Sequence, residues 1–110
     1  MVLDIKNEKE KLIVSFLDCD RIDTTNLKLI KEQLTPVVSE VNNNDKKEEQ
    51  VLDFVNINFI DSSGLTMIIN LYKTLLEHDK SLKIINVNEL VSNIFDVTKL
   101  NTFVNISNRS

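Results

Sequence analysis

The second half of the chain alternates two kinds of apolar pattern, and this alternation limits the folds available to it. Residues 50–55 and 81–87 are short apolar runs typical of strands. Each is followed by a segment with apolar residues at helical spacing, beginning near Leu65 and near Leu90. Because strands separated by helices are joined by crossovers, they become parallel neighbours in one sheet. The pattern therefore predicts an α/β fold.

Each predicted helix carries one apolar face that we expect to pack on the sheet. Asp23 or Thr24 can cap the first helix and Asn88 the third, whereas Pro36 predicts a bend or a broken turn inside the first. The predicted faces are Leu27, Ile30, Leu34, Val37 and Val38; Leu65, Ile68, Ile69, Tyr72, Leu75 and Leu76; and Leu90, Val91, Ile94, Phe95 and Val97.

The first half of the chain predicts an antiparallel addition to this sheet. Residues 11–17 read as a strand, and residues 2–5 form a short strand that pairs with it across a charged turn. Residues 102–106 predict a last short strand or extended segment. The polar segment 42–49 cannot bury apolar area and is expected to be an exposed loop. We expect one α/β domain over residues 1–110, with a mixed sheet of four to five strands covered by helices.

Composition argues against several classes of function. Thirteen basic and seventeen acidic residues give a formal net charge of −4, and no basic stripe accompanies the few aromatic residues, which disfavours nucleic acid and anionic membranes. The single cysteine, Cys19, fits a reducing compartment, and we expect it to be partly buried. The charged start does not resemble a signal peptide, and no run is long enough to cross a bilayer. We expect a cytoplasmic protein without direct membrane contact.

The residues needed for catalysis or metal binding are not gathered in the sequence. His78 is the only histidine, and it would lie about four helical turns from Ser62, too far to activate that hydroxyl. We expect it to face solvent near a helix C-terminus. The acids around Cys19 read as a solvated loop, and no glycine-rich phosphate loop is present. We therefore expect no catalytic residue, no metal and no cofactor.

The segment Asn58–Leu65, NFIDSSGL, contains the only glycine of the chain. One interpretation is structural: Asp61, Ser62 and Ser63 are good helix caps, and Gly64 lacks a side chain where the helix presses on the sheet. The other interpretation is functional. A hydroxyl at a helix N-terminus lies near free N–H groups and the positive end of the dipole, and a phosphate there would add about −1.5 to −2 charge. The local chemistry by itself favours the structural interpretation over the functional one.

Two longer stretches carry a resemblance. VLDFVNINFIDSSGLTMIINLY and LKIINVNELVSNIFDVTKLNTFVNI resemble STAS domains, and among them the bacterial anti-sigma factor antagonists. The matching positions are Leu52-Asp53-Phe54, Asp61-Ser62-Ser63-Gly64-Leu65, and Thr98-Lys99-Leu100 with Phe103. The resemblance covers most of the chain, and it extends weakly to DRIDTTNLKLIKEQL, which is similar to the acidic loop entering the family's first helix.

This resemblance implies a switch between proteins. The unphosphorylated antagonist binds an anti-sigma factor, which is a serine kinase of the histidine-kinase-like ATPase type, and a sigma factor is released. The kinase phosphorylates the position that falls on Ser62, and a metal-dependent serine phosphatase restores it. Kinase activity belongs to the partner, so the chain itself is not an enzyme. The implied partner-binding residues are Asp23, Asp61, Ser63, Gly64, Leu65 and Thr66.

Several positions depart from the family pattern. Asp20-Arg21 and Lys99 stand where glycine is usual, and Thr66 and Asn70 stand where small residues are usual. Two alternatives remain: an accessory subunit of a membrane lipid or anion transporter that is not phosphorylated, and a sensory or scaffold domain. We expect a monomer or a weak dimer.

Overall fold

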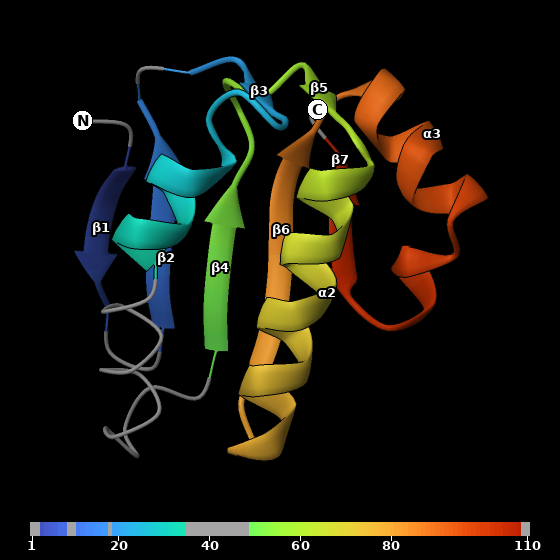
Figure 1. Ribbon diagram of the computed structural model, residues 1–110. Coiled ribbons are helices and arrows are strands. Elements are labelled where there is room, and N and C mark those ends of the chain that lie inside the picture. The colour runs from blue at the N-terminus through green and yellow to red at the C-terminus, as the bar shows by residue number, and fades with distance from the viewer. Residues whose placement is uncertain (1–2, 9–10, 18, 35–48, 109–110) are drawn as a thin grey trace.

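A computed structural model describes residues 3–8, 11–17, 19–34 and 49–108 (Figure 1). A helix covers residues 27–34. The other elements, in chain order, are β1 (Leu3–Asn7), β2 (Lys11–Phe16), β3 (Arg21–Ile22), β4 (Glu49–Asp53), β5 (Phe59–Ile60), α2 (Ser62–Glu77), β6 (Ser81–Val87), α3 (Glu89–Val97), the 3-10 helix η1 (Leu100–Thr102) and β7 (Asn105–Asn108).

The main sheet has five strands in the order β1-β2-β4-β6-β7. β1 and β2 are antiparallel, while β2, β4, β6 and β7 run parallel. The predicted α/β class and the mixed sheet are therefore confirmed. A second sheet was not predicted: β3 and β5 pair in parallel through Arg21↔Phe59 and Ile22↔Ile60. Two residues are too few to show an alternating pattern in the sequence.

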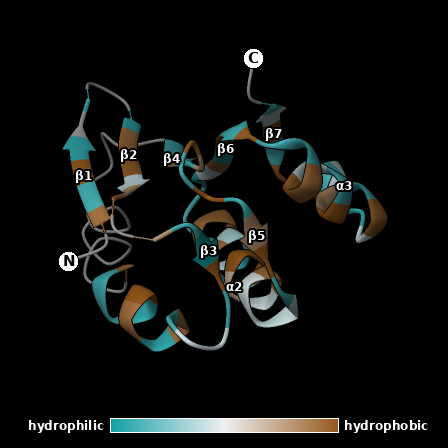
Figure 2. Cartoon of the chain, turned by 90° about the horizontal axis from the view of Figure 1, so that it is seen from above, coloured by the Kyte–Doolittle hydropathy of each residue, from teal (hydrophilic) through white to brown (hydrophobic). Residues whose placement is uncertain are grey.

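The helix over residues 27–34 and α2 cover one face of the sheet, and α3 lies toward its β7 side (Figure 1). Each of these helices carries hydrophobic and hydrophilic residues together, as amphipathic helices do (Figure 2). At the centre of the core, the rings of Phe16 and Phe54 pack edge to face with centroids 5.6 Å apart, and Phe95 packs against Phe54. Ile68 and Leu75 of α2 belong to the same buried cluster, so the core joins the sheet to both α2 and α3.

The predicted apolar face of α2 is partly wrong. Ile68 and Leu75 are buried and Leu65 and Tyr72 are half-buried, but Ile69 and Leu76 are exposed, Leu76 by 56%. The other buried residues of α2 are Gly64, Met67 and Leu71. The helix offers two overlapping apolar stripes, and the one that packs against β6 and β5 contains Gly64, which lies close to Ile22 and Ile60.

The predicted face of α3 is also partly wrong. Val91 and Phe95 are buried and Ile94 is half-buried, whereas Leu90 and Val97 are exposed, Val97 by 81%. A nine-residue helix has room for only two full turns of contact with the core. Leu90 lies one residue before the buried residues and Val97 two residues after them, and both side chains face solvent.

The remaining elements follow the prediction closely. β6 has the predicted bounds, and the Asn88 side chain caps α3 by accepting from the Val91 N–H at 2.8 Å. β7 begins at Asn105, later than predicted, because residues 100–102 form η1. Cys19 is half-buried against the core, as expected. Pro36, Val37, Val38 and nearly all of the segment 42–49 lie outside the described residues.

Candidate functional site

Asp61 connects β5 to α2 and caps the helix. Its extended backbone ends the strand, and its Oδ1 accepts a hydrogen bond from the Gly64 N–H at 2.9 Å. Its own N–H donates to the carbonyl of Ile22 at 3.1 Å, which continues the pairing of β5 with β3. The predicted cap is thus confirmed for Asp61. Ser62 and Ser63 become the first two residues of α2.

Gly64 lies where α2 packs closely against the small sheet. A Cβ atom built on it would lie 2.6 Å from Ile60 Cγ1, 2.8 Å from the Ile22 carbonyl oxygen and 2.9 Å from Ile22 Cγ2. Real Cβ atoms do not approach other heavy atoms so closely, and its φ is not positive. The only glycine of the chain is therefore required by close packing, as the structural interpretation predicted.

Asp61 also fastens the loop that precedes the first helix. Its second oxygen, Oδ2, accepts from the Thr24 N–H at 3.2 Å and from the Thr24 hydroxyl at 3.1 Å. The hydrogen bond from the Gly64 N–H has the largest effect and holds the pKa of the Asp61 carboxyl below its usual value. Desolvation opposes this effect, and the hydrogen bonds from Thr24 add to the lowering. Asp61 is therefore a carboxylate that organises two segments 37 residues apart in the chain.

Asp23 caps the first helix within this same loop. Its Oδ1 accepts from the Thr25 N–H at 3.0 Å, and its carbonyl accepts from the Leu27 N–H at 3.0 Å. The Asn26 side chain reaches back to the Asp23 N–H at 3.1 Å, so the cap is reciprocal. Of the two predicted caps, Asp23 takes the role. Thr24 turns to Asp61 instead, a contact that the sequence did not reveal.

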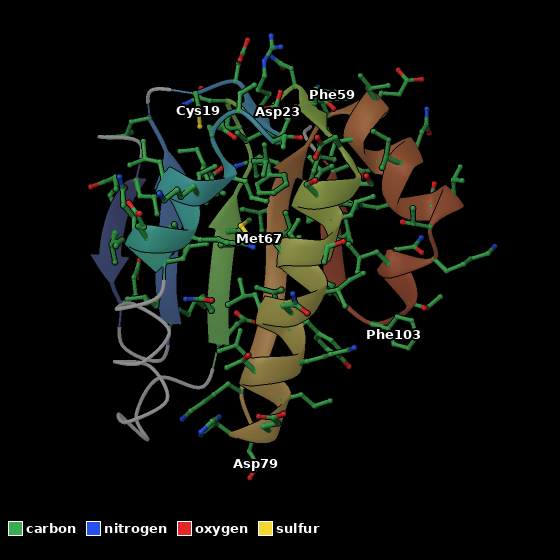
Figure 3. All side chains as sticks on the ribbon, in the orientation of Figure 1. Cys19, Asp23, Phe59, Met67, Asp79 and Phe103 are labelled. Carbon is green, nitrogen blue, oxygen red and sulfur yellow. The ribbon has the colours of Figure 1, made fainter. Side chains whose placement is uncertain are left out.

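The exposed side of this junction is formed by the start of α2 and by β5. Ser62 and Thr66 are exposed one turn apart, and the Thr66 hydroxyl donates to the Ser62 carbonyl at 2.9 Å. Phe59 is 41% exposed beside them in the chain, and Figure 3 shows it at the same end of the molecule as Asp23. Phe59 was not predicted as a site residue, because a two-residue strand such as β5 leaves no pattern in the sequence that would mark which side chain is exposed.

The other predicted site residues on α2 lie beneath this exposed side. Ser63 and Leu65 are half-buried, Leu65 packs against the core, and Gly64 is buried. These three residues set the position of the first turn of α2, while Ser62 and Thr66 project from it. We name the exposed set Phe59, Ser62 and Thr66, together with the half-buried carboxylates Asp23 and Asp61, the Ser62 surface.

His78, the only histidine of the chain, lies far from Ser62. His78 follows α2 at its far end, about 24 Å away by the rise of a 16-residue helix. It is exposed, as predicted, and its Nδ1 lies 3.0 Å from the Thr74 carbonyl oxygen. Figure 3 shows its neighbour Asp79 at the end of the molecule opposite Asp23. Across the four described stretches, no group of three or more His, Cys, Asp or Glu side chains is placed to hold a metal.

The match to a family of known domains covers nearly the whole chain. Residues 6–110 match the STAS domain family. The chain is a member of that family. Over 108 residues it is 23% identical to the anti-sigma-B factor antagonist of Bacillus subtilis, covering 98% of this chain and 92% of the relative. It is 30% identical to the anti-sigma-B factor antagonist of Staphylococcus epidermidis over 56 residues, or 51% of this chain and 52% of that relative. This last match spans about half of each protein.

Solved structures share the fold at low identity. An anti-sigma-factor antagonist (STAS) domain protein from Planctomyces limnophilus superposes with a TM-score of 0.79 at 14% identity, covering 98% of this chain and 91% of that one. The phosphorylated form of the Bacillus protein SpoIIAA gives 0.65 at 13%, covering 94% and 89%. The murine anion transporter Slc26a9 gives 0.75 at 14%, covering 96% of this chain and 17% of the transporter. This STAS chain therefore has the fold of antagonists and of one transporter segment.

Among the helices in the described part of the chain, none has the length and apolar content required to span a bilayer.

Proposed function

We propose that this STAS protein is an anti-sigma factor antagonist whose binding is switched by phosphorylation of Ser62. The observation that carries the proposal is the exposed position of Ser62 as the first residue of α2, beside the cap Asp61. An outside kinase can reach this hydroxyl. The similarity to anti-sigma-B factor antagonists over 98% of the chain supports the same partner class, an anti-sigma factor that is a serine kinase. In this proposal the chain is a cytoplasmic substrate and binding module, and not an enzyme.

The geometry accounts for a switch that works by repulsion. Asp61 already occupies the cap and takes the Gly64 N–H, so a phosphate on Ser62 would have to share the positive end of the helix with a carboxylate. An aspartate is ionised at neutral pH, and the pKa of Asp61 is lowered further by its hydrogen bonds, so this carboxylate is charged. A phosphate would therefore raise the negative charge of the Ser62 surface without accepting the hydrogen bond of the Gly64 N–H, which Asp61 already takes.

The surface also explains how one group can abolish binding. A partner that covers Phe59, Ser62 and Thr66 must desolvate whatever Ser62 carries. Leaving a charge buried without a counter-ion costs about 3 kcal/mol or more, which is roughly a hundredfold in affinity. In the proposed complex, Asp23, Asp61 and Thr66 contact the partner, while Ser63, Gly64 and Leu65 hold the first turn of α2 in place.

The test uses a candidate anti-sigma factor kinase, ATP and intact-mass measurement. We expect the wild-type chain to gain one phosphate, Ser63→Ala to gain it as well, and Ser62→Ala to gain none. In a calorimetric titration with the same kinase, Ser62→Ala should bind, and the phosphorylated protein should bind roughly a hundredfold more weakly or not at all. Phosphorylation of Ser62→Ala, or equal affinity of the two forms, would refute the proposal.

A serine phosphatase would reverse the mark. Incubating the phosphorylated chain with a metal-dependent phosphatase should return the mass and the affinity of the starting protein. Because Ser62 is exposed, no unfolding of α2 is needed for either enzyme to reach it.

The alternative function is that of an accessory subunit of a membrane transporter, which the likeness to Slc26a9 favours. In that case Ser62 would carry no phosphate, and the chain would bind a transporter assembly. Absence of any mass gain with the candidate kinases, together with co-purification of the chain with a transport ATPase, would support this function over the first.

A further inference from the structure

β1 forms one edge of the main sheet. It pairs with β2 on one side, and no other strand in the described part of the chain pairs with it (Figure 1). Ile5, at its centre, is 37% exposed. An edge strand presents a row of unpaired backbone N–H and C=O groups that can pair with another strand.

The register of the β1–β2 hairpin shows which backbone groups face outward. The Glu8 N–H donates to the Lys11 carbonyl at 2.9 Å, so these two residues form a hydrogen-bonded pair beyond Asn7↔Leu12. Hydrogen-bonded and non-hydrogen-bonded pairs alternate along an antiparallel ladder. Lys6 and Asp4 therefore direct their backbone groups to β2. Leu3, Ile5 and Asn7 direct theirs to the open edge.

We propose that β1 pairs antiparallel with β1 of a second copy of this chain, centred on Ile5. In that register Ile5 lies opposite Ile5 of the second copy, and Leu3 lies opposite its Asn7. These are the residues with outward backbone groups, so each pair exchanges two hydrogen bonds. The five residues of both strands are then paired, and the two sheets become one.

The charges of β1 select this register. Asp4 and Lys6 alternate with the hydrogen-bonded residues, so Asp4 lies opposite Lys6 of the second copy in non-hydrogen-bonded pairs, where side chains are closest. A shift by two residues in one direction would put Asp4 opposite Asp4. A shift in the other direction would put Lys6 opposite Lys6. Only the register centred on Ile5 gives two attractive contacts, which makes the strand complementary to itself.

The proposed dimer is weak and leaves the Ser62 surface free. Five paired residues on each side form a much smaller interface than the roughly 1,200 Å² of a stable complex, so we expect a weak, concentration-dependent dimer. α2 contacts β6, which is separated from β1 by β2 and β4. Each dimer would therefore present two Ser62 surfaces to partners.

Sedimentation equilibrium from micromolar to millimolar protein tests the proposal through charge exchange. Asp4→Lys or Lys6→Asp alone places like charges opposite each other and should weaken the dimer roughly tenfold or more. The double variant D4K/K6D restores opposite charges and should dimerise as the wild type does. Because Asp4 is half-buried and Lys6 is exposed, we expect each variant to fold. Circular dichroism checks this.

Hydrogen exchange of the wild-type chain gives a second readout that needs no variant. The amides of Leu3 and Ile5 should gain protection as the protein concentration rises, whereas that of Asp4, already directed to β2, should not. A chain that stays monomeric to millimolar concentration overturns the proposal. So does a dimer that both single variants leave unchanged, or one that D4K/K6D fails to restore.

Discussion

Replacing Gly64 by alanine tests whether close packing explains the only glycine of the chain. Because Gly64 does not need a positive φ, alanine would ordinarily stabilise a helix here, by about 0.4–1 kcal/mol. The structure predicts the opposite sign. The new Cβ would lie 2.6 Å from Ile60 Cγ1 and 2.8 Å from the carbonyl oxygen of Ile22.

The magnitude follows from what must move. The Ile60 side chain can turn, but the Ile22 carbonyl belongs to β3 and accepts the hydrogen bond of the Asp61 N–H. Forcing an extra methyl into such a site costs about 1–3 kcal/mol, and weakening that hydrogen bond adds about 1 kcal/mol. After subtraction of the helix-propensity gain of at most about 1 kcal/mol, the free energy of unfolding should fall by about 2 kcal/mol.

Urea unfolding followed by circular dichroism measures this change. With a slope typical of a chain of this size, the midpoint should fall by roughly 1 M. Asn70→Ala, at an exposed position of the same helix, is the control and should change stability by less than about 0.5 kcal/mol. A Gly64→Ala protein as stable as the wild type, or more stable, would refute the packing argument and leave the presence of glycine at position 64 without an explanation.

Three further results are expected. Because the folded pKa of Asp61 is lowered, its stabilising effect is present above the unfolded value of about 3.9 and is lost as the pH falls through the folded value, so acid titration should erase the advantage of wild type over Asp61→Asn. Equal stability of the two proteins at pH 7 would contradict this. Lys99 has a φ of 64°, so Lys99→Gly should raise the unfolding free energy by about 0.5–1 kcal/mol, and a loss would show that the Lys side chain matters more than the backbone. Gln50 is fully buried, and neither atom of its amide has a hydrogen-bond partner among the described residues, so Gln50→Leu should stabilise the fold by about 1 kcal/mol in the same urea assay, whereas destabilisation would imply a partner for that amide.

The fold class could be predicted because its signals are local. Short apolar runs predicted β2, β4 and β6, and segments of helical spacing followed the last two. Polar residues such as Asp61 and Asn88 fixed where α2 and α3 begin. A cap depends on one side-chain oxygen and an N–H three residues away, so it can be read from adjacent letters. The position of Ser62 as an exposed residue of the first helical turn followed from the same reasoning.

Tertiary packing decided the rest. Neither β3 nor β5 has a pattern of its own, and each exists because the other lies beside it. The hydrogen bonds of Thr24 to Asp61 bring together segments that are 37 residues apart, and no spacing rule connects them. Which apolar stripe of α2 is buried was likewise set by the close approach at Gly64. The sequence determined the fold class and the chemistry at the ends of the main elements, whereas only the folded chain could decide which surfaces meet, because that choice depends on contacts between distant residues.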